Sequence, residues 1–195
     1  MKNILKVLLL ITALFTSASA VKKDEIVNVM TSKVDSALDV LKQKDLSTTN
    51  KANKIFALID EVFDYELMGK ISLGKETWLK INNAQRAEFL KAFENKLKNS
   101  YVDKLELYTD QKVKILELTP YKKSRLQLKT EVVGKDEIYK INYNFYQNRK
   151  SNEWFIYDVD LLGVSIVQTY RKQFAGLLKE KTFDELLVIL KDTKK

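Results

Sequence analysis

Cysteine and histidine are absent from this chain of 195 residues, and their absence excludes most common catalytic and metal sites. Without cysteine there is no disulfide, zinc ribbon, iron–sulfur site or thiol nucleophile. Without histidine there is no Ser-His-Asp triad and no HExxH zinc site. No DxDxDG-like run of oxygen ligands indicates a calcium or magnesium site. We therefore expect no metal and no cofactor, and the composition favours a binding protein over an enzyme.

Proline and glycine are also scarce, with one proline and five glycines, and no linker rich in these residues divides the chain. The length suits one domain, and a hydrophobic share of 45% is too high for a disordered chain. The 34 basic residues include four arginines, which leaves 30 lysines. Proteins that recognise nucleic acids favour arginine, whose guanidinium forms bidentate hydrogen bonds with phosphates and bases. The lysine surplus therefore argues against a nucleic-acid partner and fits a solvated surface or an anionic membrane.

The first twenty residues have the layout of a secretory signal peptide. Lys2 and Lys6 flank the start of an apolar run over residues 7–15, and Ala18-Ser19-Ala20 supplies the small residues of a cleavage site. The run is shorter than the ~20 residues of a membrane-spanning helix, and no cysteine is present for a lipid anchor. We predict cleavage after Ala20, with a retained membrane anchor as the alternative. The mature domain, residues 21–195, would be exported, soluble and, in a bacterium, periplasmic.

Residues 23–108 follow a helical period. Apolar residues at steps of three and four predict a helix from Ile26 to Leu41 and a second over residues 51–63. A short helix over residues 67–73 is expected to end at Gly74, and a long helix to begin near Asn82. One face of the long helix is unusually aromatic. Its residues are Phe89, Phe93, Leu97, Tyr101 and Leu105. The simplest interpretation is a stripe that packs into the core, although such a stripe can also line a pocket.

Residues 112–162 follow a strand period, in which apolar and polar side chains alternate. They predict four strands, the first closed by Pro120 and the others joined by turns at residues 134–136 and 148–152. Two helices follow, one capped by Ser165 and one opened by a Thr182/Glu185 capping box. The predicted fold class is α+β. A twisted four-stranded antiparallel meander packs against an N-terminal helical layer and C-terminal helices, with an apolar cleft between the layers.

Paired carboxylates are the remaining candidates for acid–base chemistry. Asp158 and Asp160 lie two residues apart, on one face of the last strand. The favoured alternative is that Asp158 holds a nearby loop or helix end and Asp160 is solvated, because no second constellation supports catalysis. Ser165 has no base to activate it and is explained as a cap. Tyr170 and Arg171 could offer a hydroxyl and a cation to a phosphate, or could simply lie on a helix surface.

Two long segments resemble the MlaC family of periplasmic phospholipid carriers, also called toluene-tolerance auxiliary proteins. The first resembles the family pattern W-x-V/I-x-D-x…G-V-S-x-x-x-x-Y-R-x-x-F through Trp154, Asp158, Gly163-Val164-Ser165, Tyr170-Arg171 and Phe174. The second agrees through Phe63-Asp64, Met68, Leu73-Gly74, Trp78, Gln85, Phe89, Phe93 and Tyr101. The signal peptide and the order of helices, meander and helices fit the same family.

The resemblance implies a soluble shuttle that carries a glycerophospholipid, as cargo and without a reaction. Its partners would be an outer-membrane lipoprotein complex and an inner-membrane complex of MCE-domain and ABC-transporter subunits, and the outcome would be outer-membrane lipid asymmetry. We expect a monomer. The candidate lipid-binding residues alternate on the strands or face them from the next helix: Leu126, Leu128, Ile141, Tyr143, Trp154, Val164, Val167, Tyr170 and Phe174. Arg171 is the candidate for the head-group phosphate.

Two other hypotheses remain open on the sequence. One is an NTF2-like small-molecule-binding protein or enzyme that uses a pocket carboxylate such as Asp158. The other is an adaptor without a ligand, whose basic face docks other envelope proteins. A large apolar cavity would support the carrier, a polar pocket would support the second hypothesis, and a core without a cavity would support the third.

Overall fold

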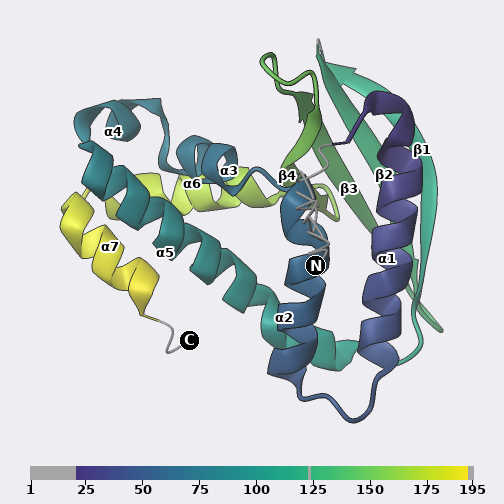
Figure 1. Cartoon of the computed structure of the whole chain (residues 1–195). Helices are drawn as coiled ribbons and strands as arrows, with labels where there is room; N and C mark the ends of the chain where they lie inside the picture. Colours follow the sequence, from purple (N-terminus) through teal and green to yellow (C-terminus); the bar gives the residue numbers. More distant parts are fainter. Residues whose placement is uncertain (1–20, 123, 193–195) are drawn as a thin grey trace, which may run out of the picture.

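The computed structural model describes residues 21–122 and 124–192, which form an antiparallel sheet with helices on one side of it (Figure 1). The predicted signal peptide lies outside the described residues. The helices are α1 (Ile26–Lys42), α2 (Thr48–Ile59), α3 (Tyr65–Leu73), α4 (Lys75–Lys80), α5 (Asn83–Val102), α6 (Ile166–Leu177) and α7 (Phe183–Lys191). Three short 3₁₀ helices are η1 (Lys23–Glu25), η2 (Asp60–Val62) and η3 (Asp103–Leu107). The predicted α+β class is confirmed.

The sheet is a meander whose strands lie in chain order. They are β1 (Lys112–Lys122), β2 (Arg125–Val133), β3 (Ile138–Gln147), β4 (Trp154–Leu161) and β5 (Val164–Ser165). The four predicted strands are present, and the two-residue β5 is an addition to them. It forms because Leu162 and Gly163 turn the chain back with positive φ angles of 54° and 83°, as in a type I′ hairpin.

Proline does not close the first strand as predicted, because β1 continues through Pro120 to Lys122. β1 is an edge strand, so a residue without an N–H group can be accommodated there. Farther into the sheet, Leu128 of β2 pairs with Tyr143 of β3, and Thr130 pairs with Ile141. These paired residues share the face of the sheet that the helices cover.

Helix ends follow the capping residues of the sequence. The side chain of Ser47 accepts a hydrogen bond from the backbone N–H of Asn50 (3.3 Å) at the start of α2. Asn82 and Gln85 form a reciprocal capping box at the start of α5, with distances of 2.9 and 3.1 Å. α4 was not predicted because its six residues are too short to show a period.

Glycine at position 69 brings α3 against α5. A Cβ atom at Gly69 would lie 2.8 Å from a methyl group of Leu90 and 3.2 Å from the ring of Phe93. The absence of a side chain therefore permits this close approach. In the described part of the chain, no helix combines the length and apolarity needed to cross a membrane.

The apolar core consists of two clusters. We call the first the helical cluster: Met68, Leu73, Trp78, Ile81, Phe89, Ala92, Phe93, Leu97, Val167, Phe174, Leu186, Leu187 and Leu190. We call the second the sheet cluster: Val21, Ile26, Met30, Val62, Leu126, Leu128, Phe145, Trp154, Ile156 and Val159. Phe63 and Ile166 are partly buried and pack against both clusters. The boundary between the clusters is where the candidate site lies.

Candidate functional site

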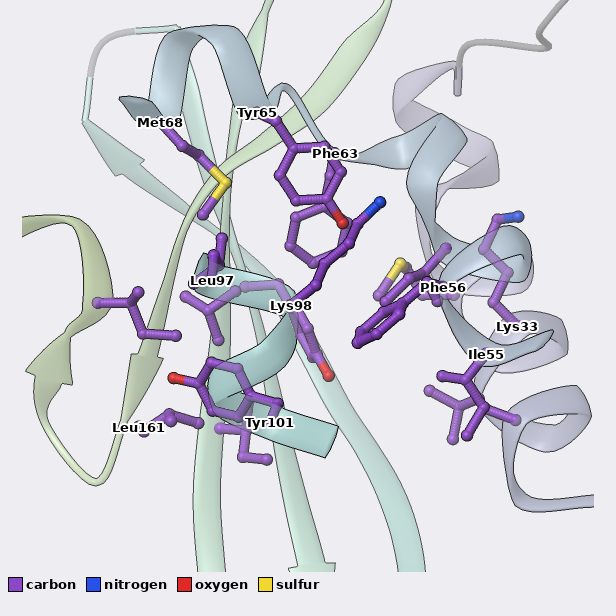
Figure 2. Close-up of a pocket in the computed structure, with 18 of the residues that line it drawn as sticks. Lys33, Ile55, Phe56, Phe63, Tyr65, Met68, Leu97, Lys98, Tyr101 and Leu161 are labelled. Atoms are coloured by element: carbon purple, nitrogen blue, oxygen red, sulfur yellow. The ribbon is translucent and has the colours of Figure 1, made fainter. Parts of the chain in front are cut away.

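A cavity of about 320 Å³ lies between the sheet and helices α1, α2 and α5 (Figure 2). Its volume is at the lower end of the ~300–1,000 Å³ range of ligand sites. The wall residues are Met30, Lys33, Val34, Ala37, Ile55, Phe56, Ile59, Phe63, Tyr65, Met68, Leu97, Lys98, Tyr101, Leu105, Ile141, Tyr143, Val159, Leu161 and Ile166. Lys33 and Lys98 carry the charges in this set, and almost all of the other side chains are apolar.

The wall is built from the two periodicities of the sequence. On the sheet, Ile141 and Tyr143 are two residues apart on β3 and pair with Leu161 and Val159 of β4. Side chains two apart on a strand project from the same face, so these residues form one side of the cavity. The other side comes from helical stripes at steps of three and four, such as Leu97, Tyr101 and Leu105.

Lys98 of α5 is held across the edge of the cavity by two carboxylates. Its Nζ lies 2.7 Å from Asp60 Oδ2 of η2 and 2.7 Å from Glu94 Oε1 of the same helix. The ammonium also lies 4.7 Å from the ring centre of Tyr65 and 5.6 Å from that of Phe56, both wall residues. Burial lowers the pKa of Lys98, but the hydrogen bonds and charges of Asp60 and Glu94 outweigh it, so the pKa is raised.

Lys33 of α1 is bound in a similar way. Its Nζ donates to the backbone oxygen of Leu58 (2.6 Å) and forms a close ion pair with Glu61 of η2. Together, two lysines face three carboxylates, those of Asp60, Glu61 and Glu94, which gives a formal charge of 2 − 3 = −1. The charged edge of the cavity therefore has no excess cation for an anionic group.

Three tyrosines contribute hydroxyl groups to the cavity wall. The hydroxyl of Tyr65 donates to Asp60 Oδ1 at 2.9 Å. Burial is the main reason that the pKa of Tyr65 is raised, and the Asp60 carboxylate adds to it. Burial, with a smaller contribution from Tyr170, raises the pKa of Tyr101 to about 12. Among the described residues, neither Tyr101 nor Tyr143 has a hydrogen-bond partner for its hydroxyl.

The structure separates the candidate lipid-binding residues into groups. Ile141 and Tyr143 line the cavity. Leu126, Leu128 and Trp154 are buried in the sheet cluster, away from the cavity wall. Val167 and Phe174 are buried in the helical cluster and Tyr170 packs against it, while Val164 is 58% exposed and Arg171 is exposed on α6. The alternating pattern on the strands thus placed two residues at the cavity, and α6 contributes Ile166 in place of the predicted positions.

Much of the cavity wall comes from helices that the sequence indicated only as core. α1 supplies Met30, Val34 and Ala37, and α2 supplies Ile55, Phe56 and Ile59. Their steps of three and four were the available signal, but a periodic stripe does not distinguish a packed core from a cavity wall. The aromatic face of the long helix did contain Leu97, Tyr101 and Leu105, which lie on the wall.

The carboxylate of Asp158 holds the start of α6. It accepts hydrogen bonds from Ser165 Oγ (2.7 Å) and from the backbone N–H of Val167 (3.1 Å). Burial raises the pKa of Asp158, although these hydrogen bonds act in the opposite direction. Asp160 was expected to be solvated, but its Oδ1 is buried and has no hydrogen-bond partner among the described residues. Within the same residues, no cluster of acidic side chains is arranged to hold a metal ion.

Two comparisons with known proteins agree with this architecture. The family model described as MlaC protein matches residues 31–192 of the chain. A solved structure, that of the phospholipid-binding protein from Ralstonia solanacearum in complex with a phospholipid, is similar with a TM-score of 0.72. The two sequences are 17% identical, and the match covers 89% of this chain and 97% of that chain.

Proposed function

Because the chain belongs to the MlaC family, we propose that it is a carrier that buries the acyl chains of a glycerophospholipid in the apolar cavity. The observation that carries this proposal is the cavity between the helical and sheet clusters, whose wall is almost entirely aliphatic and aromatic. The adaptor hypothesis expects a core without such a cavity. The NTF2-like hypothesis expects a polar pocket around Asp158, whose carboxylate instead bonds the start of α6.

The carrier role follows from the cost of exposing lipid tails to water. A two-tailed lipid exposes on the order of 30 methylene groups, at ~0.8 kcal/mol each, or roughly 24 kcal/mol in total. Unassisted movement between two membranes is therefore very slow. A protein that covers the tails removes most of this barrier without any covalent chemistry, which suits a chain without cysteine or histidine.

Within this proposal the carrier works in the periplasm after cleavage at Ala20. It receives and delivers phospholipid at an outer-membrane lipoprotein complex and at an inner-membrane complex with MCE-domain and ABC-transporter subunits. The carrier has no energy source of its own, so its partners determine the direction of transport. The charged edge at Lys33 and Lys98 is compensated by carboxylates, which leaves the head group to face solvent or a partner.

The test is to purify the chain from Val21 onward, extract it with organic solvent and identify lipids by mass spectrometry. We expect about one phospholipid for each protein molecule, with the cavity of about 320 Å³ widening to take both tails. Ala37→Trp, on the cavity wall, should fill the cavity and remove the bound lipid. Ser32→Trp, exposed on the same helix, is the matched control and should retain it. A wild-type protein that yields no phospholipid, or an Ala37→Trp variant that retains it fully, would contradict the proposal.

A further inference from the structure

The hydroxyl of Tyr143 is a polar group in an apolar cavity. Tyr143 lies on β3, where it pairs with Leu128 of β2 and with Val159 of β4. Paired strands on both sides fix the position of its backbone, and its side chain lines the cavity. No described residue forms a hydrogen bond with its hydroxyl. Tyrosine hydroxyls that are shut off from water usually have a partner, so a ligand that fills the cavity should supply an acceptor for this one.

The other two cavity tyrosines do not present the same feature. The Tyr65 hydroxyl is already bonded to Asp60. Tyr101 is in the last turn of α5, next to the exposed Ser100, where water can reach the helix end. Tyr143 is in the middle of the sheet, and burial raises its pKa, so the hydroxyl remains a protonated donor at neutral pH.

The chemistry of the proposed cargo supplies one acceptor at a suitable position. The tails of a diacyl lipid are hydrocarbon except at the ester carbonyls, where they join the glycerol. The charged edge of the cavity, at Lys33 and Lys98, is already neutralised by Asp60, Glu61 and Glu94. An uncharged acceptor that enters the cavity with the tails is therefore the better match for an uncharged donor.

We propose that the Tyr143 hydroxyl donates a hydrogen bond to an ester carbonyl of the bound lipid. This inference rests on the proposed function and adds to it a preference for one class of lipid. The contact sets how deeply the tails enter the cavity, and it selects ester-linked lipids over ether-linked lipids of the same length. An ether lipid lacks the carbonyl oxygen and keeps only the linking ether oxygen, so the hydroxyl loses the acceptor at the carbonyl position.

The experiment measures the binding of two phosphatidylcholines with equal chain lengths, one diacyl and one dialkyl, to delipidated protein. The wild-type protein should bind the diacyl lipid about fivefold more tightly, as one hydrogen bond predicts. Tyr143→Phe should weaken diacyl binding by about the same factor, leave dialkyl binding unchanged and so remove the preference. Tyr139→Phe is the matched control, because Tyr139 is on the same strand, is 42% exposed and is not on the cavity wall.

The remaining outcomes separate this inference from the carrier proposal. Equal binding of both lipids to the wild-type protein would overturn the inference and leave the carrier intact. An equal loss for both lipids in Tyr143→Phe would also overturn it, since the partner would then be water or the phosphate that both lipids share. Failure of either lipid to bind the wild-type protein would overturn the carrier proposal itself. The wild-type comparison remains decisive even when Tyr143→Phe does not fold.

Discussion

The helical cluster contains a group of contacting aromatic rings among its aliphatic residues, whereas the sheet cluster is mostly aliphatic and draws on both the strands and α1. Phe89, Phe93 and Phe174 contact one another with ring centres 5.8–6.3 Å apart. Tyr170 meets Phe93 edge-on at 5.3 Å. Aromatic rings favour the edge-on geometry that several of these pairs adopt, and the rings fill the centre of the helical cluster.

The face of the sheet is only partly covered by the helices that pack against it. Near Leu128 and Phe145 the sheet cluster is fully buried, with α1 packed beside it. Farther along the same face, Ile141 and Leu161 border the cavity. The cavity therefore lies where side chains of α1, α2 and α5 face the sheet but do not fill the space between the helices and the sheet.

Removal of one central ring should have the largest effect on the free energy of unfolding. Phe93 is fully buried and contacts the rings of Phe89, Tyr170 and Phe174. Phe93→Ala should lower the free energy of unfolding by about 3–5 kcal/mol, measured by urea denaturation with circular dichroism. Leu79→Ala, at a residue that is 65% exposed, should change it by less than about 0.5 kcal/mol. Similar losses for both variants would refute the tight packing of the helical cluster.

The same leucine truncation should distinguish the filled and open parts of the sheet face. Leu128 is fully buried, so Leu128→Ala should cost about 2–5 kcal/mol. Leu161 borders the cavity and already lacks neighbours on one side, so Leu161→Ala should cost only about 1 kcal/mol. Urea denaturation of both variants measures the difference. Equal losses would indicate that the space beside Leu161 is packed in solution.

Replacement of the Asp158 carboxyl group by an amide should disturb its hydrogen bonds to Ser165 and Val167 and so destabilise the connection between β4 and α6. Asp158→Asn retains one acceptor oxygen and should lower the free energy of unfolding by about 1–3 kcal/mol. Because the folded-state pKa of Asp158 is raised, its protonation adds stability below the unfolded value, and this addition is lost as pH rises. The difference between wild type and variant should therefore shrink as pH rises from 4 to 7. An unchanged difference would refute the burial of this carboxyl group.

The ion pairs at the edge of the cavity should have the smallest effect. Asp60 and Glu94 are each more than a third exposed, so Lys98→Gln should cost less than about 1 kcal/mol at neutral pH. The pKa of Lys98 is raised, so its contribution is complete below about pH 10.4 and disappears as pH rises through the folded-state value. Urea denaturation at pH 7 and pH 11 should show the two proteins converge. The control is Lys80→Gln, which removes an exposed pair with Glu76.

The strands were easier to predict than the helices. Alternation over residues 125–132 and 139–146 identified β2 and β3 to within one residue at each end, because the alternate apolar residues of a strand indicate which face is buried. The short helix around Trp78 was missed, since six residues do not complete two turns. The end of β1 was misplaced at Pro120 because sequence alone does not show that a strand lies at the edge of a sheet.

The candidate site was harder to predict than the fold for a physical reason. The apolar character of Phe174 and Leu126 indicates burial correctly. It does not indicate whether a side chain meets another side chain or the open space of a cavity, because the same residues serve both. Ile141 and Tyr143 were expected at the site and lie on the cavity wall, whereas Ala37 gave no signal.

The placement of the two tryptophans gives each cluster its own fluorescent reporter. Trp78 belongs to the helical cluster, and Trp154 belongs to the sheet cluster. The guanidinium carbon of Arg86 lies over the ring of Trp78, 5.3 Å from the ring centre. The two indoles therefore have different surroundings. Replacing either tryptophan with phenylalanine leaves an emission signal from one side of the cavity alone. The chain therefore allows the response of each half to a bound lipid to be followed separately, without an added dye.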